Sequence, residues 1–298
     1  MDYYNKALVK KFSETPAVTS ECVCCGSVNV GIGVVDICAF VVERMLNTIA
    51  LDDISALGVG CNDCGFICTA VRFTDEQMRG YYSEYMQDDK TSDGRVNGSY
   101  VFHRRRAEGD DWYQLLKLYK QDWWVEARAH AIARSLIAEK IDLNKIESVL
   151  DFGGDLGQYI PKEFNHARRH VVEIEERTLV DGVTAVKSPN ECDPVDLVIC
   201  CHTLEHVSYP MELVLNMKKY LKPGGLIYIE IPNEDKIVNN SSETVPLRIH
   251  EHINIFFPNS LRALLHATGF QPLNVYEIPY GNVHKDLDPA RAIIGRLL

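Results

Sequence analysis

The fold class follows from a segment of nine residues, Val149-Leu150-Asp151-Phe152-Gly153-Gly154-Asp155-Leu156-Gly157. An apolar run that suits a buried strand leads directly into a glycine-rich turn. Glycine adopts unusual backbone dihedrals and lets backbone N–H groups approach a ligand closely. Further along, the run His170-Val171-Val172 ends in Glu173, a carboxylate that can accept hydrogen bonds from both hydroxyls of a ribose. The turn and the acid together predict a site for an adenosine-containing ligand.

Two other interpretations of the turn compete with this prediction. A strand-to-helix turn can use glycine only to change direction. A nicotinamide dinucleotide would prefer the pattern G-x-G-x-x-G, which seats a pyrophosphate at the helix N-terminus, but Asp155 puts an anion at that place. The sequence therefore disfavours a dinucleotide.

The second half of the chain predicts an α/β fold. From residue 148 onward, short apolar runs alternate with segments of helical periodicity, which indicates a doubly wound, mostly parallel, Rossmann-like sheet covered on both faces. The expected strands are Ser148–Phe152, His170–Ile174, Val183–Val186, Val195–Cys201, Leu226–Ile231 and Leu273–Ile278. The expected helices are Gly157–Ala167, Met211–Leu221 and Pro258–Thr268.

The N-terminal part predicts a smaller, ribbon-like module. Short strand-like runs at Val28–Val35 and Ile54–Val59 lie between cysteine pairs. A polar, glycine-spaced connector over 86–111 and an amphipathic helix over Trp112–Lys140 follow. The expected organisation is a zinc-binding module over 1–85, a connector and linking helix over 86–140, and a catalytic domain over 141–298.

The composition is that of a globular protein. Of the 298 residues, 46% are hydrophobic and 24% are charged, which allows a substantial core. The net charge of −11 argues against wrapping a nucleic-acid backbone. The N-terminus lacks the apolar core of a secretory signal, and charged residues interrupt the most apolar stretch, 28–46. We therefore expect a cytoplasmic protein without a membrane partner; the sequence does not indicate its oligomeric state.

Seven of the ten cysteines precede residue 70. In a reducing compartment such a crowd is more often a metal site than a disulfide framework. Two C-x-x-C-G units, with Cys22 and Cys25 in the first and Cys61 and Cys64 in the second, offer four thiolates to one tetrahedral ion. Four sulfurs without an open position favour a structural zinc ion, which stabilises a module too small to fold alone.

Other roles for the cysteines are open. The pairs could form a redox dithiol, and Cys24 could replace Cys22 as a ligand. Four of the cysteines outside the two units are expected to be buried as small apolar side chains: Cys38, Cys68, Cys192 and Cys200.

Three motifs, in order, resemble those of the class I S-adenosylmethionine-dependent methyltransferases. The segment 149–157 resembles the first motif of that family, with Asp155 in place of its middle glycine. The segment 198–207 is similar to the fourth strand and the loop after it, and 221–226 is similar to the turn before the fifth strand.

The resemblance covers residues 148–278 and implies S-adenosylmethionine as the cofactor. The cofactor-binding residues that it implies are Asp151, Gly153, Gly154, Asp155, Gly157 and Glu173, with Cys201 and His202 beside the methionine portion. For Glu205 and His206, the plainer alternative is that they cap the next helix.

A more specific resemblance joins both parts of the chain. A cysteine module, a segment like 73–85, a methyltransferase core and a His-Glu-His triplet follow one another in bacterial sugar methyltransferases of the deoxysugar C-methyltransferase type. The triplet here is His250-Glu251-His252. The resemblance implies that Glu251 and His252 lie at the substrate, one of them as base, and that Tyr81 and Tyr82 reach it from the connector. Alternatively, the two tyrosines pack the domains together.

The chain departs from this sugar family in two places. Ile249 stands where the family usually has tyrosine, and the sequence lacks the family's long C-terminal extra domain. We therefore expect O-methylation of a sugar, a nucleotide-sugar or a related small molecule at least as much as C-methylation. Capsule, lipopolysaccharide and secondary-metabolite biosynthesis use such reactions.

Two other functions compete with sugar methylation. Some ribosomal-RNA methyltransferases also combine a cysteine module with this catalytic fold. Residues 1–80, however, hold six Lys or Arg against ten Asp or Glu, which would repel phosphate, and only Arg104-Arg105-Arg106 forms a basic run. The third alternative is a module that binds the cofactor without catalysis.

The chemistry needs one base. A sulfonium methyl group is already activated, so the enzyme positions the acceptor and removes a proton. Histidine can take that proton, and a neighbouring glutamate can orient its ring. His252 is the first candidate and His250 the second. Because histidines two apart on an extended segment point the same way, a metal site is one alternative, and a structural role is another.

Overall fold

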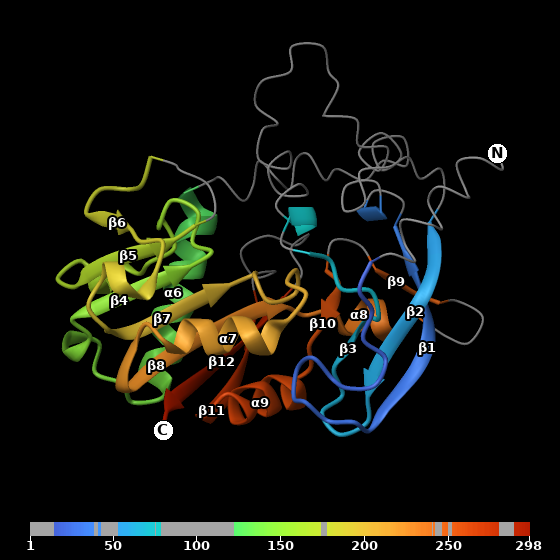
Figure 1. Ribbon diagram of the computed structural model, residues 1–298. Coiled ribbons are helices and arrows are strands. Elements are labelled where there is room, and N and C mark those ends of the chain that lie inside the picture. Colours follow the sequence, from blue (N-terminus) through green and yellow to red (C-terminus); the bar gives the residue numbers. More distant parts are fainter. Residues whose placement is uncertain are drawn as a thin grey trace, which may run out of the picture.

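The computed structural model describes residues 15–38, 41–42, 53–74, 76–78, 122–173, 178–239, 241, 246–249, 252–279 and 289–298. These residues form two sheets that lie side by side, a seven-stranded one on the left of Figure 1 and a five-stranded one on the right. Within these ranges, no helix combines the length and the apolar character that crossing a membrane requires.

The seven-stranded sheet has the order β11-β12-β8-β7-β4-β5-β6. Its strands are β4 (Ser148–Phe152), β5 (Arg168–Val172), β6 (Val183–Ala185), β7 (Val195–Cys201), β8 (Leu221–Pro232), β11 (Phe270–Ile278) and β12 (Ala290–Leu297). The neighbours from β6 to β8 pair in parallel, and β12 lies antiparallel between β8 and β11. This arrangement confirms the predicted α/β class and its doubly wound, mostly parallel sheet.

Helices cover both faces of this sheet. Alternate residues of β7 face opposite sides: Leu197 and Ile199 pack with α6 (Asp122–Ala138), whereas Val198 packs with α7 (Pro210–Lys218) and α9 (Pro258–Ala267). Such strands are buried on both faces, which explains their continuous apolar runs. The described part of the chain also contains the short helical segments α8 (Asp235–Asn239), η1 (Leu143–Lys145), η2 (Lys162–Phe164) and η3 (Pro189–Glu191).

Two sequence-based expectations for the elements are wrong. The helix expected over Gly157–Ala167 is absent, and only the single turn η2 forms there. Gly157 adopts a left-handed conformation and Pro161 lacks an N–H, so too few residues remain for a regular helix. The strand β12 was not expected at all. The first ten residues of the expected helix Trp112–Lys140 lie outside the described ranges.

The five-stranded sheet draws on distant parts of the chain. Its order is β10-β3-β2-β1-β9. Three strands come from the cysteine-rich N-terminal part of the chain: β1 (Val30–Ile37), β2 (Ile54–Cys61) and β3 (Ile67–Thr69). The two edge strands, β9 (Leu247–Ile249) and β10 (Asn254–Ile255), come from the segment that follows β8 and α8. We call this sheet with its cysteine pairs the cysteine module.

The two sheets share one apolar core. Buried residues of the cysteine module, such as Cys24 and Phe66, belong to the same cluster as Val198 of β7 and Leu264 of α9. The rings of Phe66 and Phe256 lie 4.9 Å apart between centroids. The cysteine module is therefore packed onto the larger sheet along a continuous interface.

Candidate active site

The candidate site lies at one edge of the seven-stranded sheet. Because β4, β5, β7 and β8 run in parallel, their carboxyl ends meet at the same edge, where open α/β sheets bind ligands. The glycine turn follows β4, Glu173 follows β5, the segment 202–209 follows β7, and Glu234 follows β8.

The glycine turn is packed closely against the carboxyl group of Asp151. A Cβ atom on Gly154 would lie 2.4 Å from Asp151 Oδ2, so no side chain fits at position 154. Asp155 adopts a left-handed conformation with φ of +53°, which aspartate tolerates better than most residues. Its backbone N donates to Glu173 Oε2 at 3.0 Å. Asp155 thus holds the backbone shape of the glycine it replaces and links the turn to the predicted ribose-binding acid.

Asp151 is a buried carboxyl group with an unused acceptor. Its side chain is 1% exposed, and within the described residues Oδ2 has no hydrogen-bond partner. Burial raises the pKa of Asp151 to about 7, although the nearby Arg128 acts in the opposite direction. An unsatisfied acceptor beneath a glycine turn fits a ligand that brings hydrogen-bond donors and positive charge. S-adenosylmethionine, which carries an ammonium and a sulfonium group, meets both requirements.

His202 forms the next part of the site. It follows β7 directly, has a left-handed φ of +50°, and its Nε2 lies 3.1 Å from Glu230 Oε1. Glu230 is fully buried and also accepts from Tyr228 Oη at 2.8 Å. Burial lowers the pKa of His202 to about 4, with Arg128 acting in the same direction, so the imidazole is neutral near pH 7.

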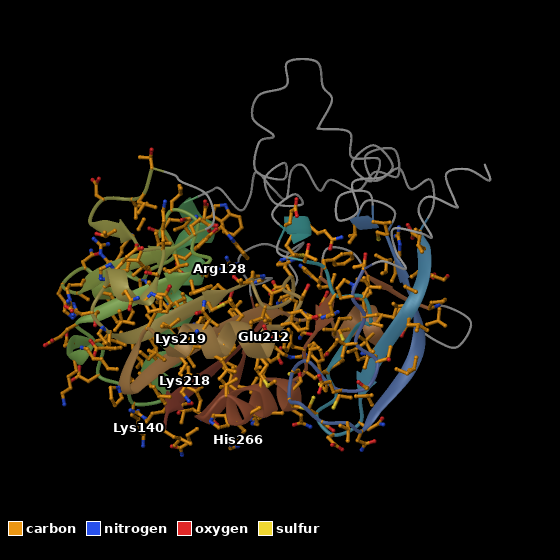
Figure 2. The ribbon with its side chains drawn as sticks, in the orientation of Figure 1. Arg128, Lys140, Glu212, Lys218, Lys219 and His266 are labelled. Carbon is orange, nitrogen blue, oxygen red and sulfur yellow. The ribbon has the colours of Figure 1, made fainter. Side chains whose placement is uncertain are left out.

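Arg128 of α6 is held firmly at the same place (Figure 2). Its Nε lies 3.2 Å from Glu230 Oε1. Its guanidinium lies 5.0 Å from the ring centroid of Trp124 and 4.6 Å from that of Tyr159. Cation–π contacts of this kind fix the orientation of a guanidinium. Arg128 therefore brings a fixed positive charge to the edge where the cofactor is expected.

A second group of titratable side chains lies beside His202. We call Glu205, His206 and His252 the Glu-His-His cluster, because one donor atom of each lies within 4.8 Å of the others. His206 and His252 meet edge to face with ring centroids 4.7 Å apart. His252 Nδ1 lies 2.9 Å from Glu234 Oε1, as expected when the imidazole N–H donates to the carboxylate. The proton then sits on Nδ1 and the lone pair on Nε2.

Glu205 is the most deeply buried member of the cluster. Neither carboxyl oxygen has a hydrogen-bond partner among the described residues, and burial raises the pKa of Glu205 to about 8. Its Oε1 lies 3.5 Å from His202 Nδ1 and 3.7 Å from His206 Nε2. The alternative in which Glu205 and His206 cap the next helix is wrong, because α7 begins at Pro210 and its N-cap, Tyr209, has no side-chain cap.

The four predicted zinc ligands come together within the cysteine module. The sulfurs of Cys22, Cys25, Cys61 and Cys64 lie within 4.8 Å of one another, with 3.8 Å between Cys22 and Cys64 and 3.7 Å between Cys25 and Cys61. A tetrahedral zinc ion with Zn–S bonds of about 2.3 Å requires sulfurs about 3.8 Å apart. The donor set therefore fits zinc.

Cys24 lies outside this group of four. Its Sγ lies 3.4 Å from the carbonyl oxygen of Ser260 in α9. Of the other cysteines, Cys38, Cys68 and Cys200 are buried as expected, whereas Cys192 is half-buried.

Several predicted site residues lie outside the described ranges: His250, Glu251, Tyr81 and Tyr82. Sequence reasoning in turn missed Arg128, Glu230 and Glu234. Glu230 had a visible signal, since it is the one charged residue in the apolar run 226–231. Arg128 and Glu234 had none, because only the fold brings them to this edge.

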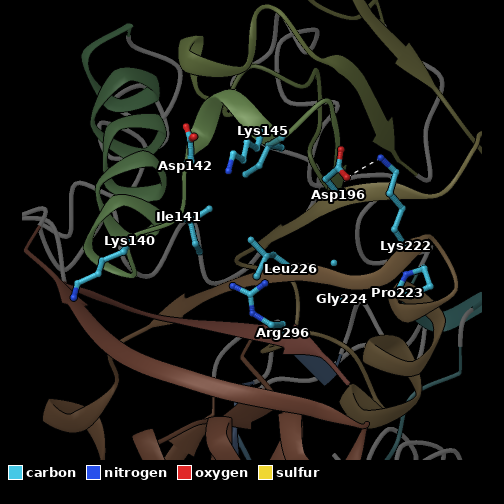
Figure 3. A pocket seen from close by; sticks show the side chains of 12 residues that line it. Lys140, Ile141, Asp142, Lys145, Asp196, Lys222, Pro223, Gly224, Leu226 and Arg296 are labelled. Carbon is cyan, nitrogen blue, oxygen red and sulfur yellow. Dashed lines mark hydrogen bonds and ion pairs between the residues drawn. The ribbon is translucent and has the colours of Figure 1, made fainter.

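A cavity lies at the opposite, amino-terminal edge of the sheet (Figure 3). Its volume is about 350 Å³, and its lining includes Lys145, Arg296 and the Lys222–Asp196 ion pair. These residues stand before β4, at the starts of β7 and β8, and at the end of the antiparallel β12. The cavity is therefore separate from the candidate active site.

Two curated proteins and several solved structures are similar to this chain. The ubiquinone biosynthesis O-methyltransferases of Aliivibrio fischeri strains ES114 and MJ11 are each 28% identical over 145 residues, which is 45% of this chain and 62% of the relative. The match thus spans less than two thirds of those relatives.

Among solved structures, a 1,6-didemethyltoxoflavin-N1-methyltransferase of Burkholderia thailandensis aligns with a TM-score of 0.44 and 19% identity, over 65% of this chain and 89% of the other. An S-adenosylmethionine-dependent methyltransferase of Aquifex aeolicus aligns with a TM-score of 0.44 and 14% identity, over 62% and 98%.

A family model gives the assignment. The model described as "Methyltransferase domain" matches residues 123–275, which is just over half of the chain and includes the glycine turn, Glu173, His202 and the Glu-His-His cluster. The chain belongs to this methyltransferase domain family and carries a class I, S-adenosylmethionine-dependent methyltransferase domain.

Proposed function

We propose that the protein transfers the methyl group of S-adenosylmethionine to a hydroxyl oxygen of a sugar or sugar-derived small molecule. The observation that carries this proposal is the Glu-His-His cluster beside the predicted cofactor site, with His252 oriented by Glu234. A hydroxyl acceptor needs a base near the transferred methyl group, and this cluster supplies imidazoles at that edge of the sheet. Methylation at carbon next to a carbonyl needs the same base and is the closest alternative.

The cofactor is assigned to the glycine turn and the residues around it. Glu173 accepts the ribose hydroxyls, while Gly153, Gly154, Asp155 and Gly157 let the backbone approach the nucleoside. Asp151 lies beneath the turn with an unused acceptor, and it receives hydrogen bonds from the amino acid portion. Cys201 and His202, at the end of β7, lie next to the sulfonium.

The reaction then needs only positioning and one proton transfer. The acceptor oxygen attacks the methyl carbon in line with the C–S bond, whose electrons remain on sulfur as S-adenosylhomocysteine forms. His252 Nε2 takes the hydroxyl proton, and Glu234 stabilises the imidazolium through Nδ1–H. His250 and Glu251, the other members of the triplet, are the alternative bases, and Tyr81 and Tyr82 are proposed to contact the acceptor.

The choice of a small polar acceptor has two supports. The curated relatives are O-methyltransferases, which favours an oxygen acceptor. The net charge of −11 and the acidic N-terminal region disfavour RNA. The sugar class itself rests on the order of motifs and on the His-Glu-His triplet.

The test is transfer of a labelled methyl group to panels of sugars, nucleotide-linked sugars, phenols and bulk RNA. We expect label in a sugar acceptor, and loss of about 10²–10⁴-fold in turnover for His252→Ala with cofactor affinity retained. Methylation of RNA that weakens steeply with salt would instead establish the RNA alternative. If the protein binds S-adenosylhomocysteine but transfers a methyl group to none of these acceptor classes, the alternative of a non-catalytic cofactor-binding module would be supported.

We also propose a structural zinc ion on Cys22, Cys25, Cys61 and Cys64. The sulfur separations support it, and a reducing cytoplasm, where we place the protein, keeps thiolates available for metal. Closed four-sulfur sites contribute folding free energy rather than catalysis. Elemental analysis of protein purified without added metal should find one zinc ion per chain.

A further inference from the structure

Residues 204–208, which include Glu205 and His206, form neither a helix nor a strand. Their backbone carbonyls nevertheless accept hydrogen bonds from residues far away in the sequence. Asn254 donates three hydrogen bonds to this segment. Two run from Nδ2 to the carbonyl oxygens of residues 204 and 207, at 2.8 and 2.6 Å, and one from the backbone N to that of residue 205, at 3.1 Å. Arg72 Nη1 donates to the carbonyl oxygen of residue 208 at 2.9 Å. Four of the five carbonyls over 204–208 are thus held by two residues.

Arg72 uses its whole guanidinium to do this. Besides the bond to residue 208, Nη1 donates to Asn254 Oδ1 at 2.9 Å. Nη2 donates to the carbonyl and hydroxyl oxygens of Thr69, and Nε donates to the carbonyl of Val71 at 3.0 Å. All five N–H groups of the side chain are therefore satisfied, in a residue that is 1% exposed.

The anchor of Arg72 is the cysteine module. Thr69 ends β3, and β3 pairs with β2 on one side and with β10 on the other. Asn254 itself begins β10, two residues after His252. One guanidinium therefore connects the sheet of the cysteine module, the approach to His252 and the segment of Glu205 and His206.

We infer that Arg72 of the cysteine module is a positioning residue for methyl transfer, because it fixes the backbone on which the Glu-His-His cluster is mounted. This inference rests on the function proposed above for that cluster. Lysine cannot substitute, since three donors on a flexible stem do not replace a planar fork of five. The cysteine module is thereby part of the catalytic apparatus even though no atom of Arg72 meets the reacting groups.

The first experiment needs no acceptor. Full-length Arg72→Lys, checked for unchanged zinc content, is compared with the parent by hydrogen exchange of the peptide over 202–209. We expect exchange of this peptide to be faster by at least about tenfold, as for a segment that has lost its tertiary hydrogen bonds, while peptides of β7 and β8 are unchanged. The affinity for S-adenosylhomocysteine should stay within about twofold of the parent, because the glycine turn is untouched.

The second experiment measures turnover on the acceptor found in the labelled-methyl panel. A misplaced base costs about 10²-fold, so kcat of Arg72→Ala should fall by that order while KM for S-adenosylmethionine changes little. Millimolar guanidinium ion should restore part of the lost kcat in Arg72→Ala, because it fills the vacated donor position. Ammonium ion should not restore it, and neither ion should rescue His252→Ala.

The matched control is Arg248→Met. Arg248 lies on β9 of the same sheet, is 46% exposed and pairs with Asp53, so its loss should leave exchange over 202–209 and kcat unchanged. Unchanged exchange in a folded, zinc-containing Arg72→Lys would overturn the inference, and so would faster exchange with full turnover. If the parent methylates no acceptor, the proposed function fails, but the exchange comparison still decides whether Arg72 fixes the segment.

Discussion

Burial and ligand binding place opposite demands on the carboxyl group of Asp151. Burial raises its pKa from 3.8 to about 7, so the folded protein keeps a proton that the unfolded chain has lost. This group therefore lowers the free energy of unfolding as the pH rises from about 4 to about 7. Asp151→Asn should raise that free energy at pH 8 by at most about 4 kcal/mol, measured by urea denaturation without ligand.

The informative quantity is the difference between Asp151→Asn and the parent across pH. It should be small at pH 3, where the carboxyl group is protonated in both states, and should grow up to pH 7. The same variant should bind S-adenosylhomocysteine more weakly, because the amide cannot offer a charged acceptor to the ammonium group. A stability difference that is constant from pH 3 to pH 8 would show that the carboxyl group is not desolvated.

In the proposed mechanism, Glu234 acts on the reaction through the ring of His252. Glu234→Gln keeps an acceptor near Nδ1 but removes the charge that stabilises the imidazolium, so we expect kcat to fall by roughly tenfold. The measurement is initial rates at saturating S-adenosylmethionine. Glu212→Gln, at an exposed site on α7, is the control and should retain full turnover (Figure 2). Equal rates for Glu234→Gln and the parent would remove His252 as the base.

At the scale of elements, the glycine turn depends on its last member, Gly157. Its φ is +76°, and a Cβ atom there would lie 2.8 Å from Val183 Cγ1 in β6. Gly157→Ala should therefore cost about 1–2 kcal/mol in backbone strain, plus the cost of moving β6. Thermal unfolding measures the loss. In the double variant that adds Val183→Ala to Gly157→Ala, we expect recovery only of the stability lost to the steric clash. Full recovery would argue against backbone strain at position 157.

Elements differ in how far the sequence predicts them. The strands β4 and β7 coincide with their expected bounds, because buried parallel strands are continuous apolar runs between turns. The helix expected after the glycine turn fails because local conformation at Gly157 and Pro161 overrides the apolar pattern. The place of β12 between β8 and β11 is set by tertiary pairing, which no local pattern in the sequence encodes.

Prediction of the candidate site from the sequence meets the same limit. Asp151, Glu173 and the four clustered cysteines could be predicted as candidates because each belongs to a short motif with its own spacing. Arg128, Glu230 and Glu234 come from three separate elements, and no spacing joins them. The partnership of Arg72 with Asn254 spans 182 residues and depends on how β3 and β10 pair. Sequence patterns reveal local chemistry, whereas long-range hydrogen bonds emerge only from the fold.

At the scale of the whole molecule, we expect the proposed zinc ion and the candidate active site to be coupled. Phe66 and Cys24 lie in the same apolar cluster as α9 and β7, so the cysteine module cannot unfold without exposing that core. Removing zinc with a chelator, or Cys61→Ser, should lower the melting temperature and accelerate exchange over 246–255 and 202–209. Scanning calorimetry should show one transition. Two separate transitions, with the second unaffected by the chelator, would show that the module unfolds by itself.

The edge strands β9 and β10 have a consequence for how the chain folds during its synthesis. The four clustered cysteines leave the ribosome early, but the outer edges of β1 and β3 meet β9 and β10 only after residue 255 has been synthesised. Asn254 follows its partner Cys68 by 186 residues, and at about 5–20 residues added per second the two edges wait on the order of 10–40 s. During that interval the proposed metal ion would add a cross-link to the β1–β2 and β2–β3 pairings of the nascent module. We therefore expect early metallation to keep the nascent module folded while its two strand edges are open, until the last third of the chain arrives to close them.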